Sequence, residues 1–252
     1  MKYLIFLIIS LSLNSCYSSS PSMHYSVAQN VPLLTQKNEL RLSAATGTEN
    51  YGFQGAYAFT NALAVMGSYS NGSTFDNGNR SSGEFAVGYF KKLKDSTIIE
   101  IYGGAGRYHR DFQVWDDALA GMLPPDTFRT NCTEPFVQFD LGFKNNGHHS
   151  FSLSGKFGYL FYDHFYSFHA GAAFGPTYTT TNHASAEPTT AVCLTYRRGG
   201  KRLSFQAQVG LSIASPVSTY DPGGDLFVNV GLSLRLFGDR AVSVSTTKKG
   251  MN

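Results

Sequence analysis

Hydrophobic and polar residues alternate along much of this chain with a period of two residues. In the stretch 226–237, leucine and valine occupy the even positions, while asparagine, glycine, serine and arginine occupy most of the odd positions. Side chains of a β-strand point alternately to its two faces, so the stretch predicts a strand with one apolar face and one mostly polar face. About ten residues are enough for a tilted strand to cross a bilayer.

Ten segments show this alternation, and their connections predict how they are joined. After the first hairpin, short connections that contain Gly, Asn, Asp or Lys alternate with generally longer ones. Short periplasmic turns and longer extracellular loops alternate in this way in outer-membrane barrels. The sequence therefore predicts an all-β fold, an antiparallel up-and-down transmembrane β-barrel of ten strands, with eight or twelve as alternatives. The predicted strands are 39–46, 52–59, 63–70, 83–91, 97–107, 136–143, 151–162, 190–197, 203–212 and 226–237.

Charged residues are almost absent from the apolar face of the ten predicted strands; the exceptions, Lys91 and Arg107, are each the last residue of their strand. A charge that faces lipid near the bilayer midplane costs about 2–4 kcal/mol, which explains this segregation. The polar face is rich in Gly, Ser, Ala and Gln, which suits a crowded lumen better than the Lys- and Glu-rich surface of a soluble sandwich or lipocalin-like barrel. We expect the charges of the polar face to form a paired, structural network in the lumen. The alternative is a constriction that selects small ions or solutes. These charged residues are Arg41, Glu84, Glu100, Asp140, Lys156 and Arg235.

The overall composition agrees with a membrane barrel. Charged residues make up 15% of the 252 residues, against a usual share of about 25%. No internal apolar run reaches the length of about 18 residues that a transmembrane helix needs. The net charge of +3 is too small and too dispersed to indicate nucleic-acid binding.

The amino terminus predicts a secretion signal. Lys2 is followed by an apolar run, so residues 1–15 are expected to be a signal peptide. Leu13-Asn14-Ser15-Cys16 resembles a bacterial lipobox, which implies cleavage before Cys16 and lipidation of that residue. The alternative is an ordinary signal peptide with an incidental cysteine. The Ser-rich chain that follows predicts a flexible periplasmic tether over 16–38, ahead of the barrel at 39–237 and a periplasmic tail at 238–252.

Several stretches resemble the small outer-membrane β-barrel lipoproteins of Bacteroidota. Besides the lipobox and the tether, these stretches are Val31-Pro32-Leu33-Leu34 leading into Glu39-Leu40-Arg41-Leu42, Gly55-Ala56-Tyr57-Ala58-Phe59, and Phe205-Gln206-Ala207-Gln208-Val209. The resemblance covers most of the chain and implies a fold and a location. It implies no particular activity. The surface-export signals of Bacteroidota lipoproteins are usually acidic, and no acidic cluster follows Cys16, so the resemblance to such lipoproteins implies a lipid in the inner leaflet of the outer membrane.

Other candidate chemistry is weaker. Cys132 and Cys193 form a possible disulfide, because the predicted location is oxidising. The long connections 109–134 and 163–189 contain Asp and His residues, among them Asp111, Asp116 and His164. Such residues in the loops of a ten-stranded barrel resemble those of the omptin surface proteases, although no specific omptin motif is present. We expect no catalytic residue, no metal site and no cofactor.

The sequence-based expectation is therefore an outer-membrane β-barrel lipoprotein with an envelope-structural or surface-binding role. The alternatives are a narrow passive channel for ions or small solutes and, less favoured, an omptin-like surface hydrolase. The expected partners are membrane lipid, the barrel-assembly machinery and the lipoprotein-sorting machinery; no nucleic acid is expected, and an extracellular ligand is not identified. An even number of strands puts the start of the first strand and the end of the last strand on the same side of the membrane, so both termini are expected in the periplasm.

Overall fold

The structure, a computed structural model, describes residues 27–47, 50–73, 78–93, 96–114, 126–145, 148–169, 177–181, 186–200, 202–214 and 224–236. Within these ranges the chain forms eleven strands and is all-β. The strands are β1 (Leu40–Gly47), β2 (Tyr51–Ala58), β3 (Leu63–Ser73), β4 (Asn79–Lys92), β5 (Thr97–Val114), β6 (Asp126–Asn145), β7 (His149–His169), β8 (Thr177–Thr181), β9 (Ala186–Gly199), β10 (Leu203–Ala214) and β11 (Gly224–Leu236).

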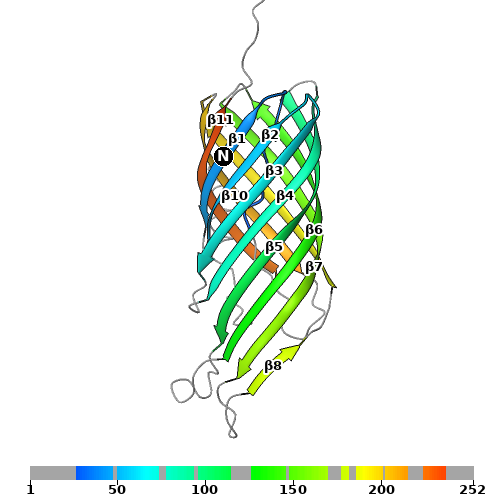
Figure 1. The fold of residues 1–252 in the computed structure, drawn as a ribbon. Coiled ribbons are helices and arrows are strands. Elements are labelled where there is room, and N and C mark those ends of the chain that lie inside the picture. The colour runs from blue at the N-terminus through cyan, green and yellow to red at the C-terminus, as the bar shows by residue number, and fades with distance from the viewer. Residues whose placement is uncertain are drawn as a thin grey trace, which may run out of the picture.

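Ten of these strands close into an antiparallel barrel, which confirms the predicted fold and strand number. Each strand pairs with the next along the chain, except that β7 pairs with β9, and β11 returns to pair with β1. β8 stands outside the ring and pairs only with the far end of β7. Figure 1 shows the tilted strands of the closed barrel. Because Leu40 pairs with Leu236, the first and last strands of the barrel start and finish at the same end, which also carries the four short turns. We call this end the short-turn mouth.

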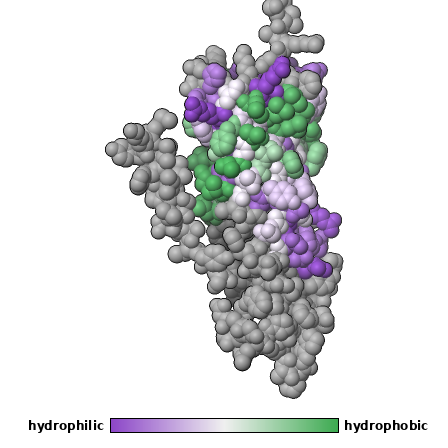
Figure 2. Space-filling view, turned by 90° about the vertical axis from the view of Figure 1, so that its left-hand side faces the viewer, coloured by the Kyte–Doolittle hydropathy of each residue, from purple (hydrophilic) through white to green (hydrophobic). Residues whose placement is uncertain are grey.

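The outer face of the barrel is apolar, as the alternation predicts. Large hydrophobic side chains such as Phe85, Phe139 and Leu194 are exposed on it, while their neighbours along each strand point into the lumen. Figure 2 shows apolar residues gathered between hydrophilic groups that lie toward the top and at the lower right of the molecule. Among the described residues, no helix is long and apolar enough to cross a membrane.

One side of the barrel is taller than the other. β5, β6 and β7 contain 18, 20 and 21 residues, and with β8 they extend beyond the other strands at the bottom of Figure 1. The connections 109–134 and 163–189 are therefore in large part strand. For 109–134 the sequence predicted a long loop, and that prediction was wrong; for 163–189 the sequence left open whether the segment is a loop or a strand extension. Alternation gives no register in these segments because it marks one only where one face meets lipid. Both faces of an extension beyond the bilayer meet polar surroundings.

The lumen contains a segment of the chain itself. Residues 27–38, which we call the strap, run inside the barrel, and residues 28–34 are all buried. The sequence predicted this part of 16–38 as flexible tether, and for residues 27–38 that prediction was wrong. The rest of the predicted tether and the predicted tail 238–252 lie outside the described residues.

Candidate functional site

The first described residue of the strap lies in the half of the lumen away from the short turns, and the strap ends at the short-turn mouth. Val27 packs against a cluster that contains Tyr108 and Leu160, in the half of the barrel away from the short turns. At the other end, the backbone N–H of Asn38 donates to the carbonyl of Ala58, the last residue of β2. The strap thus runs along the lumen with its carboxyl end at the short-turn mouth.

Side-chain amides from three strands bind the strap backbone. Gln54 of β2 donates from Nε2 to the carbonyl of Ala28 at 2.7 Å. Gln208 of β10 donates to the carbonyl of Gln29 and Gln138 of β6 to that of Asn30, each at 2.8 Å. A buried backbone carbonyl needs a hydrogen-bond partner, and among the described strands none forms a backbone ladder with residues 28–34 of the strap. The glutamines of the polar strand face therefore replace a β-ladder.

A carboxylate accepts hydrogen bonds from two further backbone N–H groups of the strap. Glu100 on β5 accepts from the N–H of Leu33 at 2.9 Å and from that of Leu34 at 2.7 Å, one on each oxygen. Leu33 has a φ of 52°, which lies in the left-handed region that non-glycine residues rarely adopt. Successive N–H groups around such a residue form a concave nest that suits an anion. The strained conformation of Leu33 is thus explained by the two charge-assisted hydrogen bonds that it permits.

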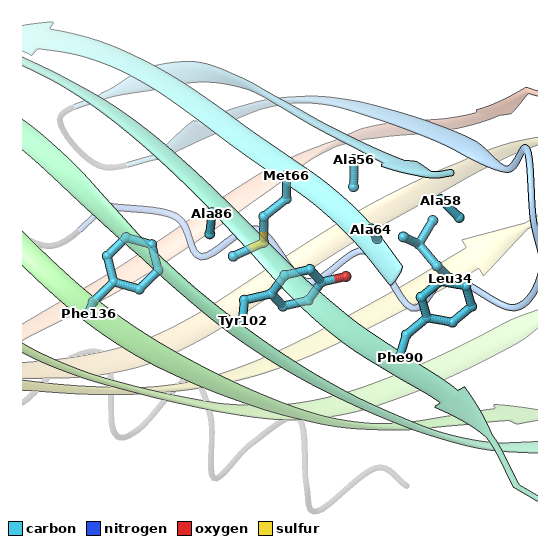
Figure 3. Packing of buried hydrophobic residues seen from close by; sticks show 9 residues of the cluster. All are labelled: Leu34, Ala56, Ala58, Ala64, Met66, Ala86, Phe90, Tyr102 and Phe136. Atoms are coloured by element: carbon cyan, nitrogen blue, oxygen red, sulfur yellow. The ribbon is translucent and has the colours of Figure 1, made fainter. Parts of the chain in front are cut away.

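Small inward-facing residues make room for the strap. Leu34 packs in one apolar cluster with Ala58, Ala64 and Phe90, as Figure 3 shows. Leu33 lies over Gly142, where an added Cβ would stand 2.3 Å from a methyl group of Leu33. The sequence predicted a crowded lumen from the small residues on the polar strand face. In the structure, the strap occupies the space that these small residues leave.

A charged cluster fills the lumen beside the amino end of the strap. The Lys156 ammonium lies 2.7 Å from Glu84 Oε1 and 2.9 Å from Glu134 Oε2. The Tyr108 hydroxyl lies between the same two carboxylates and accepts a hydrogen bond from Lys156 at 3.0 Å. The Thr189 hydroxyl donates to the other oxygen of Glu134. These side chains, with Val27 and Ala28, line a small cavity of about 20 Å³, which has room for about one water molecule.

A second charged cluster lies at the short-turn mouth. Glu39, which precedes β1, is fully buried and binds two guanidinium groups, those of Arg41 at 3.2 Å and Arg235 at 2.7 Å. Thr35 of the strap donates to the same carboxylate through its N–H and its hydroxyl. Burial alone raises the pKa of Glu39, but the two guanidinium groups and the Thr35 hydrogen bonds outweigh burial and hold the pKa below its ordinary value.

The six charges predicted for the lumen all lie inside the barrel, but they do not form one network. Glu84 and Lys156 lie at the amino end of the strap, Glu100 lies beneath its middle, and Arg41 and Arg235 lie at the short-turn mouth. Asp140 accepts from Gln138, the residue that also binds the strap. Sequence reasoning missed three further members: Glu39, Glu134 and Arg197. Glu39 and Arg197 share the lumen register of Arg41 and Gln206, which was a usable signal, whereas Glu134 fell in a segment predicted as loop.

The possible disulfide between Cys132 and Cys193 is not present, because both are buried free thiols. Along β7, Cys132 pairs with Tyr162 and Cys193 with Ser154, eight positions apart. At about 3.3 Å per residue, that offset is far beyond the Cα separation of less than 7 Å that a disulfide allows. Cys16, the predicted lipidation site, lies outside the described residues.

Acidic and histidine side chains of the predicted loops form ion pairs on the strand extensions. Asp111 accepts from Arg129 at 2.9 Å and lies 3.4 Å from His109, whose other ring nitrogen is 2.8 Å from Asn131. Exposed pairs of this kind contribute little to stability. Asp116 lies outside the described residues, as does the side chain of His164. In the described ranges, no group of three or more His, Cys, Asp and Glu side chains is placed to hold a metal ion.

No protein-family model and no curated protein matches this chain. Among solved structures, the chain is similar to the translocator domain of the autotransporter NalP from Neisseria meningitidis, with 13% identity over 78% of this chain and 87% of that one and a TM-score of 0.44. It is similar to the N-terminal β-barrel domain of Pseudomonas aeruginosa OprF, with 10% identity, coverage of 79% and 98%, and a TM-score of 0.34. It is also similar to the KdgM porin, with 11% identity, coverage of 79% and 99%, and a TM-score of 0.35.

Proposed function

We propose that this chain is an outer-membrane β-barrel whose resting state is closed and whose role is structural or surface-binding rather than catalytic. The observation that carries the proposal is the strap, whose buried residues 28–34 occupy the lumen. Hydrogen bonds from Gln54, Gln138, Gln208 and Arg197, together with the two to Glu100, hold it there. The apolar outer face supports placement in a bilayer, and short turns face the periplasm in barrels of this kind.

Conductance in planar bilayers tests the closed state. The purified protein is expected to insert without discrete current steps, because the buried strap and the inward side chains occupy the lumen. Stable steps of uniform size from the unmodified protein would contradict the proposal. Membrane insertion has to be shown independently, by the faster gel migration of unboiled protein.

The second candidate is a narrow passive channel, and one observation favours it. The strap is held by hydrogen bonds and packing, so it can leave the lumen without breaking the backbone pairing of the barrel strands. A variant in which residues 27–36 become a Gly-Ser sequence of equal length keeps the strand registers and removes the strap side chains. If the strap closes the lumen, this variant is expected to conduct. If the variant is folded and silent, the inward side chains close the barrel by themselves and the channel candidate has no support.

We also propose that Cys16 carries lipid on the side of the membrane opposite the short-turn mouth. The direction of the strap supports this, because Val27, its first described residue, lies in the half of the lumen away from the short turns. Val27 follows Cys16 by eleven positions, which span at most about 40 Å when extended. The lipid would then lie on the outer side of the membrane, unlike the sequence-based expectation of an inner-leaflet anchor and a periplasmic amino terminus.

An epitope inserted after Tyr17 tests this direction on intact cells. Antibody binding to the epitope, with no binding to the same epitope placed in the tail 238–252, is the expected result. An amino-terminal epitope that becomes accessible only after the outer membrane is permeabilised would contradict it. Labelled palmitate that is lost in Cys16→Ala tests the lipid separately.

A further inference from the structure

Two adjoining cavities open at the short-turn mouth. One has a volume of about 190 Å³ and the other about 220 Å³, and Lys144 and Arg235 line both. We call these two cavities together the vestibule. Among the described residues, neither cavity is lined by an aspartate or a glutamate. The basic residues that line the vestibule are Arg41, Lys92, Lys144, His148, His149, Arg197, Arg202 and Arg235.

Among the described residues, the basic groups that line the vestibule outnumber the carboxylates near it, which are Glu39, Glu100 and Asp140. Glu39 binds both Arg41 and Arg235, so one carboxylate serves two guanidinium groups. Arg197 donates to the carbonyl of Val31 and to Gln206, which are both uncharged. In the described part of the chain, Nη1 of Arg197 and Nε of Arg41 are buried and have no hydrogen-bond partner. A buried donor without a partner costs free energy, and an incoming acceptor would recover it.

We propose that the vestibule is a binding site for a phosphate group. Guanidinium groups present planar forks of N–H donors that match phosphate oxygens, and here they come from different strands: Arg41 from β1, Arg197 from β9 and Arg235 from β11. A tetrahedral phosphate can accept from several forks at once, whereas a planar carboxylate accepts one fork in the bidentate manner. Ser150, Ser204 and Ser233 also line the cavity and offer hydroxyl donors.

The phosphate can have two sources. A phosphorylated solute can enter from the aqueous side of the mouth, or the headgroup of an anionic phospholipid can reach it from the surrounding leaflet, because the short turns stand at a membrane–water interface in such barrels. The proposal concerns the recognition of phosphate and does not depend on whether the lumen conducts.

Titration calorimetry with inorganic pyrophosphate tests the site, using the full-length mature protein in nanodiscs of phosphatidylcholine. Saturable binding that weakens as salt is added is expected, with no binding of acetate at the same concentration. Repeating the titration in nanodiscs with added phosphatidylglycerol separates the sources. Unchanged binding identifies a solute site, and loss of binding identifies a site that the lipid headgroup already occupies. Absence of pyrophosphate binding in phosphatidylcholine would overturn the proposal.

Matched variants locate the site. Arg235→Gln and Arg202→Gln each remove one lining guanidinium and are expected to weaken binding about tenfold. Arg198→Gln is the control, because Arg198 belongs to the same strand end but is exposed in the outward register of β9. Its affinity is expected to stay within about twofold. Equal losses in the control and in the lining variants would overturn the assignment. Arg202 is itself exposed, so its variant remains informative if Arg235→Gln fails to fold.

Discussion

The two charged clusters of the lumen differ in how their charges are balanced. Beside the amino end of the strap, Lys156 lies between Glu84 and Glu134, with the Tyr108 hydroxyl as a further partner. At the short-turn mouth, a single carboxylate, Glu39, serves two guanidinium groups while further basic residues line the vestibule. A buried charge is tolerated when it is paired, whereas a charge at an open mouth can be satisfied by water or by a ligand. We therefore expect the cluster around Lys156, the deep cluster, to stabilise the barrel, and the cluster around Glu39, the mouth cluster, to take part in binding the proposed phosphate group.

The largest expected effect concerns the deep cluster. Lys156→Met leaves two carboxylates in the lumen without their cation and is expected to lower the free energy of unfolding by about 3–5 kcal/mol. Heat- or urea-induced loss of the fast-migrating gel form measures this. Lys91→Met removes an exposed lysine from β4 and is expected to change stability by about 0.5 kcal/mol or less. Equal effects of the two substitutions would remove the distinction between the deep cluster and the rest of the charges.

A smaller effect is expected where the strap meets Glu100. Glu100→Ala removes the acceptor of the Leu33 and Leu34 N–H groups and is expected to cost about 1.5–3 kcal/mol, because both hydrogen bonds involve a charged group. Glu100→Gln keeps one acceptor oxygen and is expected to cost less. The same unfolding assay ranks the variants, and a Gln variant less stable than the Ala variant would contradict the proposed nest.

The smallest effect concerns the mouth cluster and is a pH dependence. The pKa of Glu39 is lower in the folded protein, so its ionised form adds stability above the ordinary value of 4.5, and this contribution is lost as the pH falls through the folded pKa. Stability is therefore expected to decline more steeply below about pH 4.5 in the natural protein than in Glu39→Gln. Urea unfolding at each pH measures the free energy of unfolding of both proteins. If the two values decline in parallel, the acid sensitivity belongs to other carboxylates.

The alternation of apolar and polar residues predicted the barrel wall well. Residues such as Phe53, Val87 and Leu232 were placed on the outer face from periodicity alone, and all three are exposed there. The pattern succeeds because lipid imposes one rule on every second residue. It failed on the part of β6 that is farthest from the short-turn mouth and left the corresponding part of β7 open, since strands that extend beyond the bilayer are not subject to that rule.

The contents of the lumen were harder to predict. The strap has no period of its own, because its partners are side chains of β2, β5, β6, β9 and β10 rather than a neighbouring backbone. The glutamines of the polar strand face were correctly expected in the lumen, but nothing local in the sequence shows that Gln54, Gln138 and Gln208 each bind a strap carbonyl. The separation of the six predicted charges into groups likewise depends on strand stagger, which the sequence pattern does not encode.

Hydrogen–deuterium exchange of residues 27–38 in the folded barrel tests the central claim most directly. The Leu33 and Leu34 amides donate to buried Glu100, so a peptide that covers them is expected to exchange as slowly as the barrel strands and faster in Glu100→Ala. Complete exchange within seconds in the natural protein, as for a free tether, would contradict the account of a lumen closed by its own amino-terminal strap.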